Sequence, residues 1–151
     1  MDYMKLAADA TIDGMKKGFG GPFGATLVKD GEVIVSVSNT MMRDTDPSAH
    51  AEMVAIREAC KKLGRIDLSD CEIYATCEPC PMCMGAILWA GIPKVYYSNT
   101  REDAAKHGFS DKHLREYLDG RNETHVEMIQ RNDCPACDNL WQEFEQLQVE
   151  K

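Results

Sequence analysis

Four side chains in two short segments have the types and spacing of a catalytic metal site. Pro47–Glu52 contains an imidazole (His50) and a carboxylate (Glu52), and the segment that begins at Cys77 contains the thiols of Cys80 and Cys83, spaced Cys-x-x-Cys. Zinc binds nitrogen and sulfur tetrahedrally, and a catalytic zinc is held by three protein ligands so that water takes the fourth position. The sequence therefore predicts zinc ligation by His50, Cys80 and Cys83, with Glu52 left free to move protons.

Both segments lie at predicted helix starts. Asp46 and Pro47 are a good N-cap and first helical residue for one helix, and Pro81 begins another. His50 and Glu52 are about 200° apart on an ideal helix, so they can converge only on something beyond its N-terminal end. Two helix N-termini at one metal would place positive dipole ends near the thiolates, which lowers thiol pKa values.

Composition limits the class of protein. The chain has 151 residues, of which 44% are hydrophobic and 28% charged, which fits one domain over 1–151 with a proper core. The net charge of −8 disfavours a nucleic-acid partner. The apolar stretch 82–92 is too short to cross a membrane, and the acidic N-terminus does not fit a secretory signal. We therefore expect a cytoplasmic protein that binds neither nucleic acid nor membrane.

The pattern of strands and helices predicts an α/β domain. Asp30-Gly31 is a hairpin signal between two strand-like runs, and a first helix is expected over residues 2–18. The expected strands are 25–28, 32–38, 73–76, 94–98 and 126–129, and the last expected helix is 139–149. Alternating strands and helices favour a mixed five-stranded sheet with helices on both faces.

The zinc motifs carry a resemblance to a known family. His-x-Glu followed by Pro-Cys-x-x-Cys is an already known signature of zinc-dependent deaminases of bases. The sequence resembles the cytidine deaminase superfamily over nearly all its length, and within it the bacterial guanine deaminase branch. The segments that match are 20–25, 46–52, 77–83 with 85–87 and Trp89, 103–105 and 108–111. The resemblance implies the three-layer α/β/α cytidine-deaminase-like fold.

The resemblance also implies a reaction. With one Zn²⁺ per chain on His50, Cys80 and Cys83, water would replace the amino group of a base, and guanine would become xanthine and ammonia. Glu52 would take the proton of water and deliver protons to the ring nitrogen and the departing amine.

Four further site residues follow from the resemblance alone. Asn39 would lie on the floor of the site and hydrogen-bond the base, and Phe23 would stack on or wall the ring. Trp89 matches an aromatic near the substrate, and Asp111 a carboxylate suited to the N–H edge of guanine. Each has a structural alternative: Phe23 and Trp89 as core aromatics, Asn39 as a turn residue and Asp111 as a helix cap.

The resemblance implies a homodimer in which the C-terminal segment, 139–151, is exchanged between subunits and closes over the partner's site. The alternative is that the apolar side of this helix, which contains Trp141, Phe144 and Leu147, only packs within one chain.

Other functions share the same zinc residues. A tRNA adenosine deaminase needs a basic surface, whereas this chain is acidic. A cytosine deaminase would have a tighter pocket, and an inactive zinc-stabilised binding module would have no need of Glu52. The second Cys-x-x-Cys, Cys134 and Cys137, could form another zinc site with Cys60 and Cys71, although the acidic neighbours of the pair disfavour thiolates.

Overall fold

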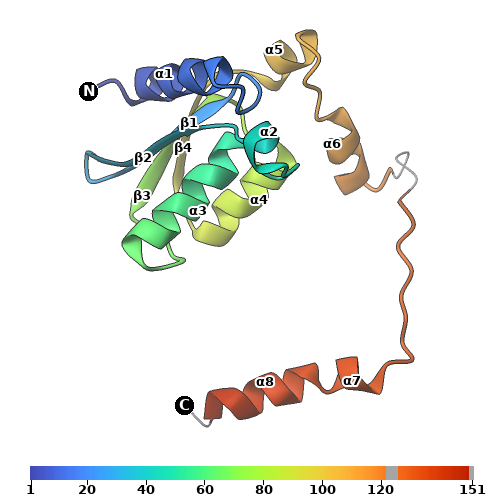
Figure 1. Cartoon of the computed structure of the whole chain (residues 1–151). Coiled ribbons are helices and arrows are strands. Elements are labelled where there is room, and N and C mark those ends of the chain that lie inside the picture. The colour runs from blue at the N-terminus through green and yellow to red at the C-terminus, as the bar shows by residue number, and fades with distance from the viewer. Residues whose placement is uncertain (122–125, 150–151) are drawn as a thin grey trace. The chain divides into compact units, whose positions relative to one another are not determined.

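The structure, a computed structural model, describes residues 1–121 and 126–149 (Figure 1). The chain divides into two compact units, Met1–Arg121 and Asn122–Lys151. Residues 150–151 of the predicted C-terminal segment lie outside the described residues. The zinc motifs and all four predicted substrate residues belong to the first unit.

A mixed sheet forms the centre of the first unit. Its strands are β1 (Gly24–Lys29), β2 (Glu32–Ser38), β3 (Cys71–Cys77) and β4 (Lys94–Asn99), in the order β2-β1-β3-β4. β1 is antiparallel to both β2 and β3, whereas β3 and β4 are parallel. The predicted hairpin is confirmed: Asp30 and Gly31 both have positive φ, 49° and 76°, as a tight turn between twisted strands requires.

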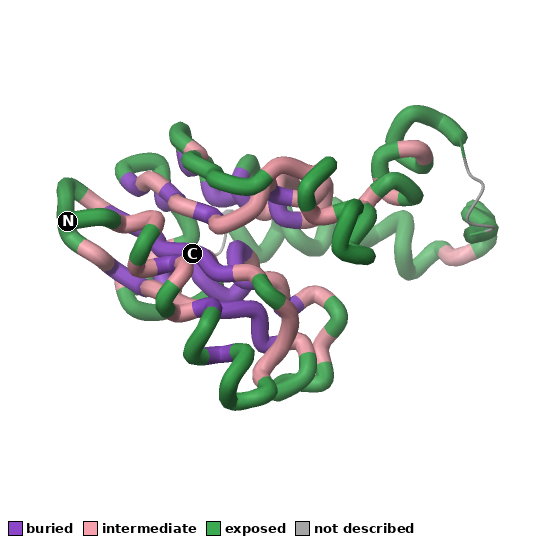
Figure 2. Tube along the Cα trace, turned by 90° about the horizontal axis from the view of Figure 1, so that it is seen from above, coloured by how far each residue is buried: buried purple, intermediate pink, exposed green. Residues whose placement is uncertain are grey.

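Helices cover both faces of this sheet, as predicted (Figure 1). The long helix α1 (Tyr3–Lys16) lies on one face, and α3 (Ala51–Leu63) and α4 (Pro81–Ala90) lie on the other. The apolar core forms between the sheet and this second pair, from strand residues such as Leu27 and Ile73 and from the small residues Ala51 and Ala55 of α3. Figure 2 shows the same distribution, with buried residues concentrated in the strands and the facing helices.

Small residues let α1 approach the sheet closely. A Cβ at Gly24 would overlap Thr11 Oγ1 and the backbone carbonyl of Ala7, and a Cβ at Gly14 would overlap Ser38 Oγ. Because backbone atoms cannot rotate away as side chains can, only glycine fits at position 24. This contact fixes the start of β1, which directly follows Phe23 of the predicted site.

Short helices complete both units. In the first unit these are α2 (Met41–Asp44), α5 (Arg101–Lys106) and α6 (Lys112–Leu118). The second unit contains α7 (Pro135–Asp138) and α8 (Leu140–Val149), so the prediction of a last helix is confirmed. No helix among the described residues is long and apolar enough to cross a membrane.

The prediction of five strands is wrong, because the sheet of the described chain has four. Residues 126–129 were expected to form the fifth, and they have no strand conformation. Three of these four side chains are apolar, which is compatible with a strand, but a strand also needs a neighbour for its backbone hydrogen bonds. Val126, Met128 and Ile129 are all exposed.

The predicted start of the helix at Asp46-Pro47 is also wrong. The helix α3 begins at Ala51, four residues later, and its N-cap residue is His50. The Asp46 carboxylate instead accepts hydrogen bonds from the backbone N–H and the hydroxyl of Ser48, at 2.8 and 2.7 Å. This local turn competes with the helix for the Asp46 side chain. Its consequence is that His50 is extended and lies beyond the helix end.

Candidate active site

His50, Cys80 and Cys83 converge where two helices begin. His50 is the N-cap residue of α3 and Cys80 that of α4, whose first helical residue is Pro81 as predicted. The Nδ1 atom of His50 lies 3.6 Å from both the Cys80 and the Cys83 Sγ atoms. The three potential ligand atoms all lie within 4.8 Å of one another. The sequence-predicted metal ligands are therefore brought together.

The spacing of these atoms fits zinc. A tetrahedral ion about 2.3 Å from sulfur and about 2.0 Å from nitrogen requires a sulfur–nitrogen distance of about 3.5 Å. The observed distances of 3.6 Å agree with this value. A set of one imidazole and two thiols is also the donor chemistry that zinc prefers.

The thiols share hydrogen bonds that favour one thiolate. The Cys83 thiol next to Cys80 lowers the pKa of Cys80 to about 4, with His50 contributing in the same direction. The same hydrogen bond raises the pKa of Cys83, and burial adds to that increase. The hydrogen bond with Cys80 raises the pKa of His50. Metal binding must therefore displace a proton from this cluster.

Glu52 lies at the second position of α3 and is only 7% exposed. Its burial raises the pKa of its carboxyl group above the usual range. A carboxylate whose pKa is raised toward neutral pH can both accept and return a proton. Glu52 lines the same cavity as His50 and Cys80, so the convergence expected beyond the helix end is present.

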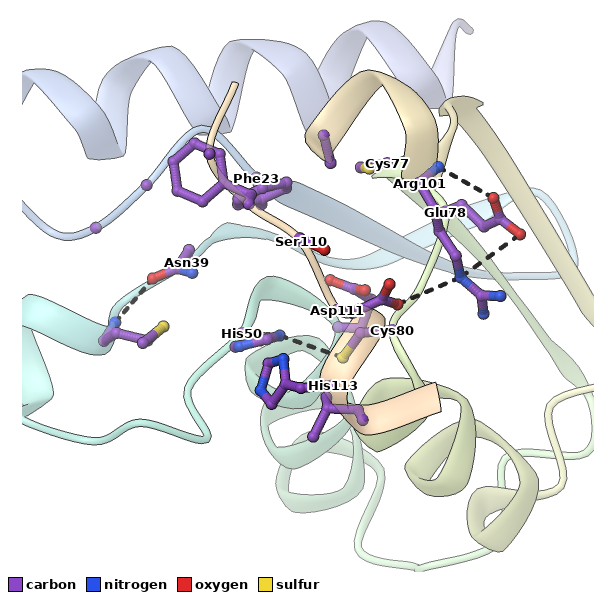
Figure 3. Close-up of a pocket in the computed structure, with 18 of the residues that line it drawn as sticks. Phe23, Asn39, His50, Cys77, Glu78, Cys80, Arg101, Ser110, Asp111 and His113 are labelled. Atoms are coloured by element: carbon purple, nitrogen blue, oxygen red, sulfur yellow. Dashed lines mark hydrogen bonds and ion pairs between the residues drawn. The ribbon is translucent and has the colours of Figure 1, made fainter. Parts of the chain in front are cut away.

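A cavity of about 480 Å³ lies in front of these residues (Figure 3). Its walls come from the 20–23 loop, the start of α2, the two helix starts, the β3–α4 loop, α5 and the 108–114 segment. The lining is mixed, with apolar side chains such as Phe23, Met42 and Phe109 beside the acidic Glu78 and Asp111. A cavity of this size, with a few polar groups among apolar side chains, suits a small molecule.

Asn39 and Phe23 both line the cavity (Figure 3). Asn39 is 4% exposed, and its Oδ1 accepts a hydrogen bond from the Met41 N–H at 2.9 Å. The expected turn contact is thus present, and it leaves the Nδ2 donor without a hydrogen bond to the described part of the chain. The Phe23 ring packs edge-on against Phe109, with centroids 5.1 Å apart. Phe23 also packs against the core, so it joins the core and the cavity wall.

Asp111 lines the cavity, whereas Trp89 does not. The Asp111 side chain is 14% exposed and pairs with Arg101 and Arg115. Although Asp111 is the residue before α6, its side chain makes no capping hydrogen bond. Trp89 lies on α4 and is 93% exposed in the described chain. The cavity of a single described chain therefore does not include Trp89, and the substrate role of this residue stays a prediction.

The zinc-ligand geometry agrees with a family relationship over most of the chain. Residues 1–99 match the cytidine and deoxycytidylate deaminase zinc-binding region. The chain belongs to this deaminase family. As a member it is a zinc-dependent hydrolytic enzyme, with His50, Cys80 and Cys83 as the group that can bind one zinc ion.

Several known deaminases are similar to this one. The guanine deaminase of Bacillus subtilis is 47% identical over 117 residues, 78% of this chain and 75% of that protein. Its solved structure matches with a TM-score of 0.85 and 38% identity over 95% of both chains. The guanine deaminase structure from Nitrosomonas europaea matches with a TM-score of 0.68 and 26% identity over 80% of this chain and 72% of that one. The tRNA-specific adenosine deaminase of Aquifex aeolicus is 48% identical over 77 residues, 51% of each chain.

Sequence reasoning missed several residues of this deaminase site, among them His113, which was expected to be a surface residue and lines the cavity. Glu78, Arg101 and Phe109 all line the cavity. Phe109 and Glu78 lie inside segments that carry the family resemblance, so those segments were the available signal. Arg101 had no signal, because its contacts with Glu78 and Asp111 depend on how separate loops meet.

Of the further cysteines, Cys71 is fully buried, and burial followed by a hydrogen bond to Asp70 raises its pKa to about 11. A second zinc site that includes Cys71 stays a prediction, and the raised pKa of Cys71 disfavours the thiolate form that binds zinc.

Proposed function

We propose that this deaminase hydrolyses guanine to xanthine and ammonia. The observation that carries the proposal is that one cavity is lined by His50 and Cys80 of the zinc-ligand group, by Glu52 and by the carboxylate of Asp111. Guanine presents adjacent N–H donors on its base-pairing edge, where adenine and cytosine do not. A carboxylate only accepts hydrogen bonds, so Asp111 selects for such an edge.

Zinc at this site would supply Lewis acidity, which lowers the pKa of water from 15.7 toward ~7. Glu52 takes the proton that the attacking water loses. The water oxygen bonds to the ring carbon that bears the amino group. Glu52 delivers this proton to the ring nitrogen, then takes the remaining proton of the new hydroxyl group and passes it to the amine. The carbon–oxygen double bond forms as the carbon–nitrogen bond breaks and ammonia leaves. One buried carboxyl group thus serves both halves of the reaction.

Two other side chains would hold the base. Asn39 has its Oδ1 engaged by the Met41 N–H, so its Nδ2 is the atom that donates to the base. Phe23 offers a ring held by Phe109 as a wall for the purine plane. A donor and an acceptor on different sides of one cavity fix the orientation of the base before water attacks.

The rival substrate is adenosine in tRNA, since similarity to such deaminases is also found. Charge favours the free base, because the net charge of −8 repels a phosphate backbone. The extent of similarity supports the same choice, since the Bacillus subtilis guanine deaminase structure matches over 95% of this chain. A structure from work on tRNA:A34 deaminases matches over 65%, with a TM-score of 0.63.

Ammonia release from the purified zinc-loaded protein tests the proposal. The panel is guanine, guanosine, adenine, cytosine, cytidine and an anticodon stem-loop RNA. We expect release with guanine and at least about 100-fold lower kcat/KM with adenine, cytosine, cytidine and the RNA, because their target bases do not offer the adjacent N–H donors that Asp111 accepts. Guanosine has the same edge as guanine, so its rate reports whether the cavity also admits a ribose. Preference for the RNA or for cytosine would replace the substrate assigned here. No turnover of any base, with zinc bound, would favour the inactive binding module.

The same proposal includes a cytoplasmic homodimer in which 139–151 closes over the partner's site. Exposed apolar side chains support it in each unit taken separately. In α8 these are Leu140, Trp141, Phe144 and Leu147, and in the first unit they include Leu88, Trp89, Tyr96 and Tyr97. A lone chain that exposes this much aromatic surface is expected to associate. Cysteines needed as metal ligands suit a reducing compartment.

Mixing two inactive variants tests the exchange. One variant is Glu52→Gln in the full chain, and the other is a chain that ends at residue 138 and lacks α8. We expect each alone to have little activity, and the mixture to recover it, because the intact site of the shortened chain receives the C-terminal segment of the other. Light scattering should give a dimer mass for the full chain. A monomer mass, or a mixture as inactive as its components, would rule out the exchange.

A further inference from the structure

Arg101 is attached to the loop that carries a zinc ligand (Figure 3). It is the first residue of α5, and its Nη2 donates a hydrogen bond to the Pro79 carbonyl oxygen at 3.0 Å. Its backbone N–H donates to Glu78 Oε1 at 3.2 Å. Both acceptors immediately precede Cys80. Two hydrogen bonds, one from the side chain and one from the backbone, therefore fix Arg101 relative to the metal site.

The same guanidinium group contacts Asp111. The Arg101 Nε atom lies 3.4 Å from Asp111 Oδ2 and 3.8 Å from Glu78 Oε2. This Nε atom is buried and makes no hydrogen bond in the described chain, so these two carboxylates are the charges that face it. The Arg101, Glu78 and Asp111 side chains are 29%, 27% and 14% exposed. Charges at such depth are screened less by salt than surface charges are.

We propose that Arg101 is a positioning residue that holds the Asp111 carboxylate at a set place relative to the zinc-ligand loop. The inference rests on the proposed function, in which Asp111 accepts from the N–H edge of guanine. Asp111 belongs to the segment between α5 and α6, whereas Cys80 begins α4. Arg101 touches both the Cys80 loop and Asp111, so it links the part that binds the base to the part that activates water.

This link matters because the reaction tolerates little displacement. The ring carbon must stand within about 3–3.5 Å of the attacking oxygen, and a shift of about 1 Å can cost about 10²-fold in rate. Without Arg101, Asp111 would still bind Arg115 and could still accept from the base. The base would then be bound, but at a variable distance from Glu52. Loss of Arg101 should therefore lower kcat more than it raises KM.

Arg115 provides a matched control within the same cluster. Its Nε lies 2.9 Å from Asp111 Oδ1, a shorter ion pair than that of Arg101. It is 44% exposed, pairs with Asp111 from the same helical segment at i,i+4, and does not line the cavity. Arg115 thus shares the charge and the partner of Arg101 but provides no link to the zinc-ligand loop.

The test compares Arg101→Met, Arg101→Lys and Arg115→Met by guanine kinetics and zinc content. We expect Arg101→Met to keep its zinc and to lose about 10- to 100-fold in kcat. Arg101→Lys should recover part of the loss, because it keeps the charge but cannot reproduce the planar geometry of the guanidinium group. Arg115→Met should change kcat by less than about 3-fold. Equal effects of the two Met variants, or zinc loss in Arg101→Met, would overturn the proposal.

Coupling to Asp111 separates positioning from a general structural role. In the Asp111→Asn background, Arg101→Met should cause little further loss in kcat/KM, because Arg101 acts through that carboxylate. Fully additive losses would contradict this. A crystal structure of zinc-loaded Arg101→Met gives a readout that needs no turnover, with Asp111 expected to be displaced and an unmoved Asp111 counting against the proposal. If the wild type deaminates a base other than guanine, the proposed function fails. The role of Arg101 is then tested by the same kinetic comparison on that base.

Discussion

Glu52→Gln is expected to lower guanine turnover by about 10⁴-fold while zinc content stays at one per chain. General acid–base catalysis contributes about 10²–10⁴-fold, and the upper end applies because Glu52 would carry the proton in both directions. Glutamine has nearly the same shape, so the packing at this 7% exposed position is kept. The folded state should not suffer, because the amide removes a buried charge. Ammonia release and metal analysis on the same sample measure both quantities.

Glu58→Gln is the matched control for this substitution. Glu58 lies on the same helix, α3, and is exposed, so the change in side-chain chemistry is identical while the cavity is untouched. We expect its kcat to equal that of the wild type. If Glu52→Gln retained activity within tenfold with its zinc in place, another group would have to move the protons and the assigned role of Glu52 would be wrong.

Local sequence was sufficient to predict the metal site. Pro81 and the Cys-x-x-Cys spacing fix Cys80 and Cys83 at one helix start, because the first turn of a helix places residues i and i+3 on one side. His50 was expected to converge with the other site residues beyond the N-terminal end of its helix, but the start of that helix was placed at Asp46-Pro47, whereas α3 begins at Ala51. The Asp46–Ser48 turn delays the helix, and this delay places His50 beyond the helix end.

Features that depend on distant partners were predicted less well. Residues 126–129 have a strand pattern, but a pattern does not provide a neighbouring strand, and none forms in the described chain. Arg101 gave no signal in the sequence, because its partners are brought to it only by the fold. Glu78 lies 23 residues before Arg101, and Asp111 lies in the segment between α5 and α6. Trp89 was expected near the substrate from the family resemblance, yet it is 93% exposed and does not line the cavity of the described chain.

Removing the zinc is expected to abolish activity and lower the melting temperature by about 10 °C. A ligand present at about 1,000 times its Kd stabilises the folded state by about 4 kcal/mol. At this chain length each kcal/mol of stability shifts the melting temperature by about 2–4 °C, so the loss of zinc should lower it by about 10 °C. The reason lies in the buried thiols. Cys83 is 0% exposed, and its pKa is raised when Cys80 holds the thiolate. Zinc replaces this shared proton and connects α3 to α4. Differential scanning fluorimetry before and after chelation measures the shift, and added zinc should restore both properties.

Cys83→Ser should behave as the zinc-free protein even with zinc in excess, because a hydroxyl is a much poorer zinc ligand than a thiolate. Cys137→Ser is the matched control: Cys137 is also part of a Cys-x-x-Cys pair but is exposed in the second unit, outside the zinc-ligand group. It should keep one zinc, full activity and the wild-type melting temperature. If chelation removed the metal without changing activity, the reaction would not use zinc. If Cys137→Ser lost zinc in parallel with Cys83→Ser, a second metal site would have to be included, because one zinc at the two helix starts would not account for that loss.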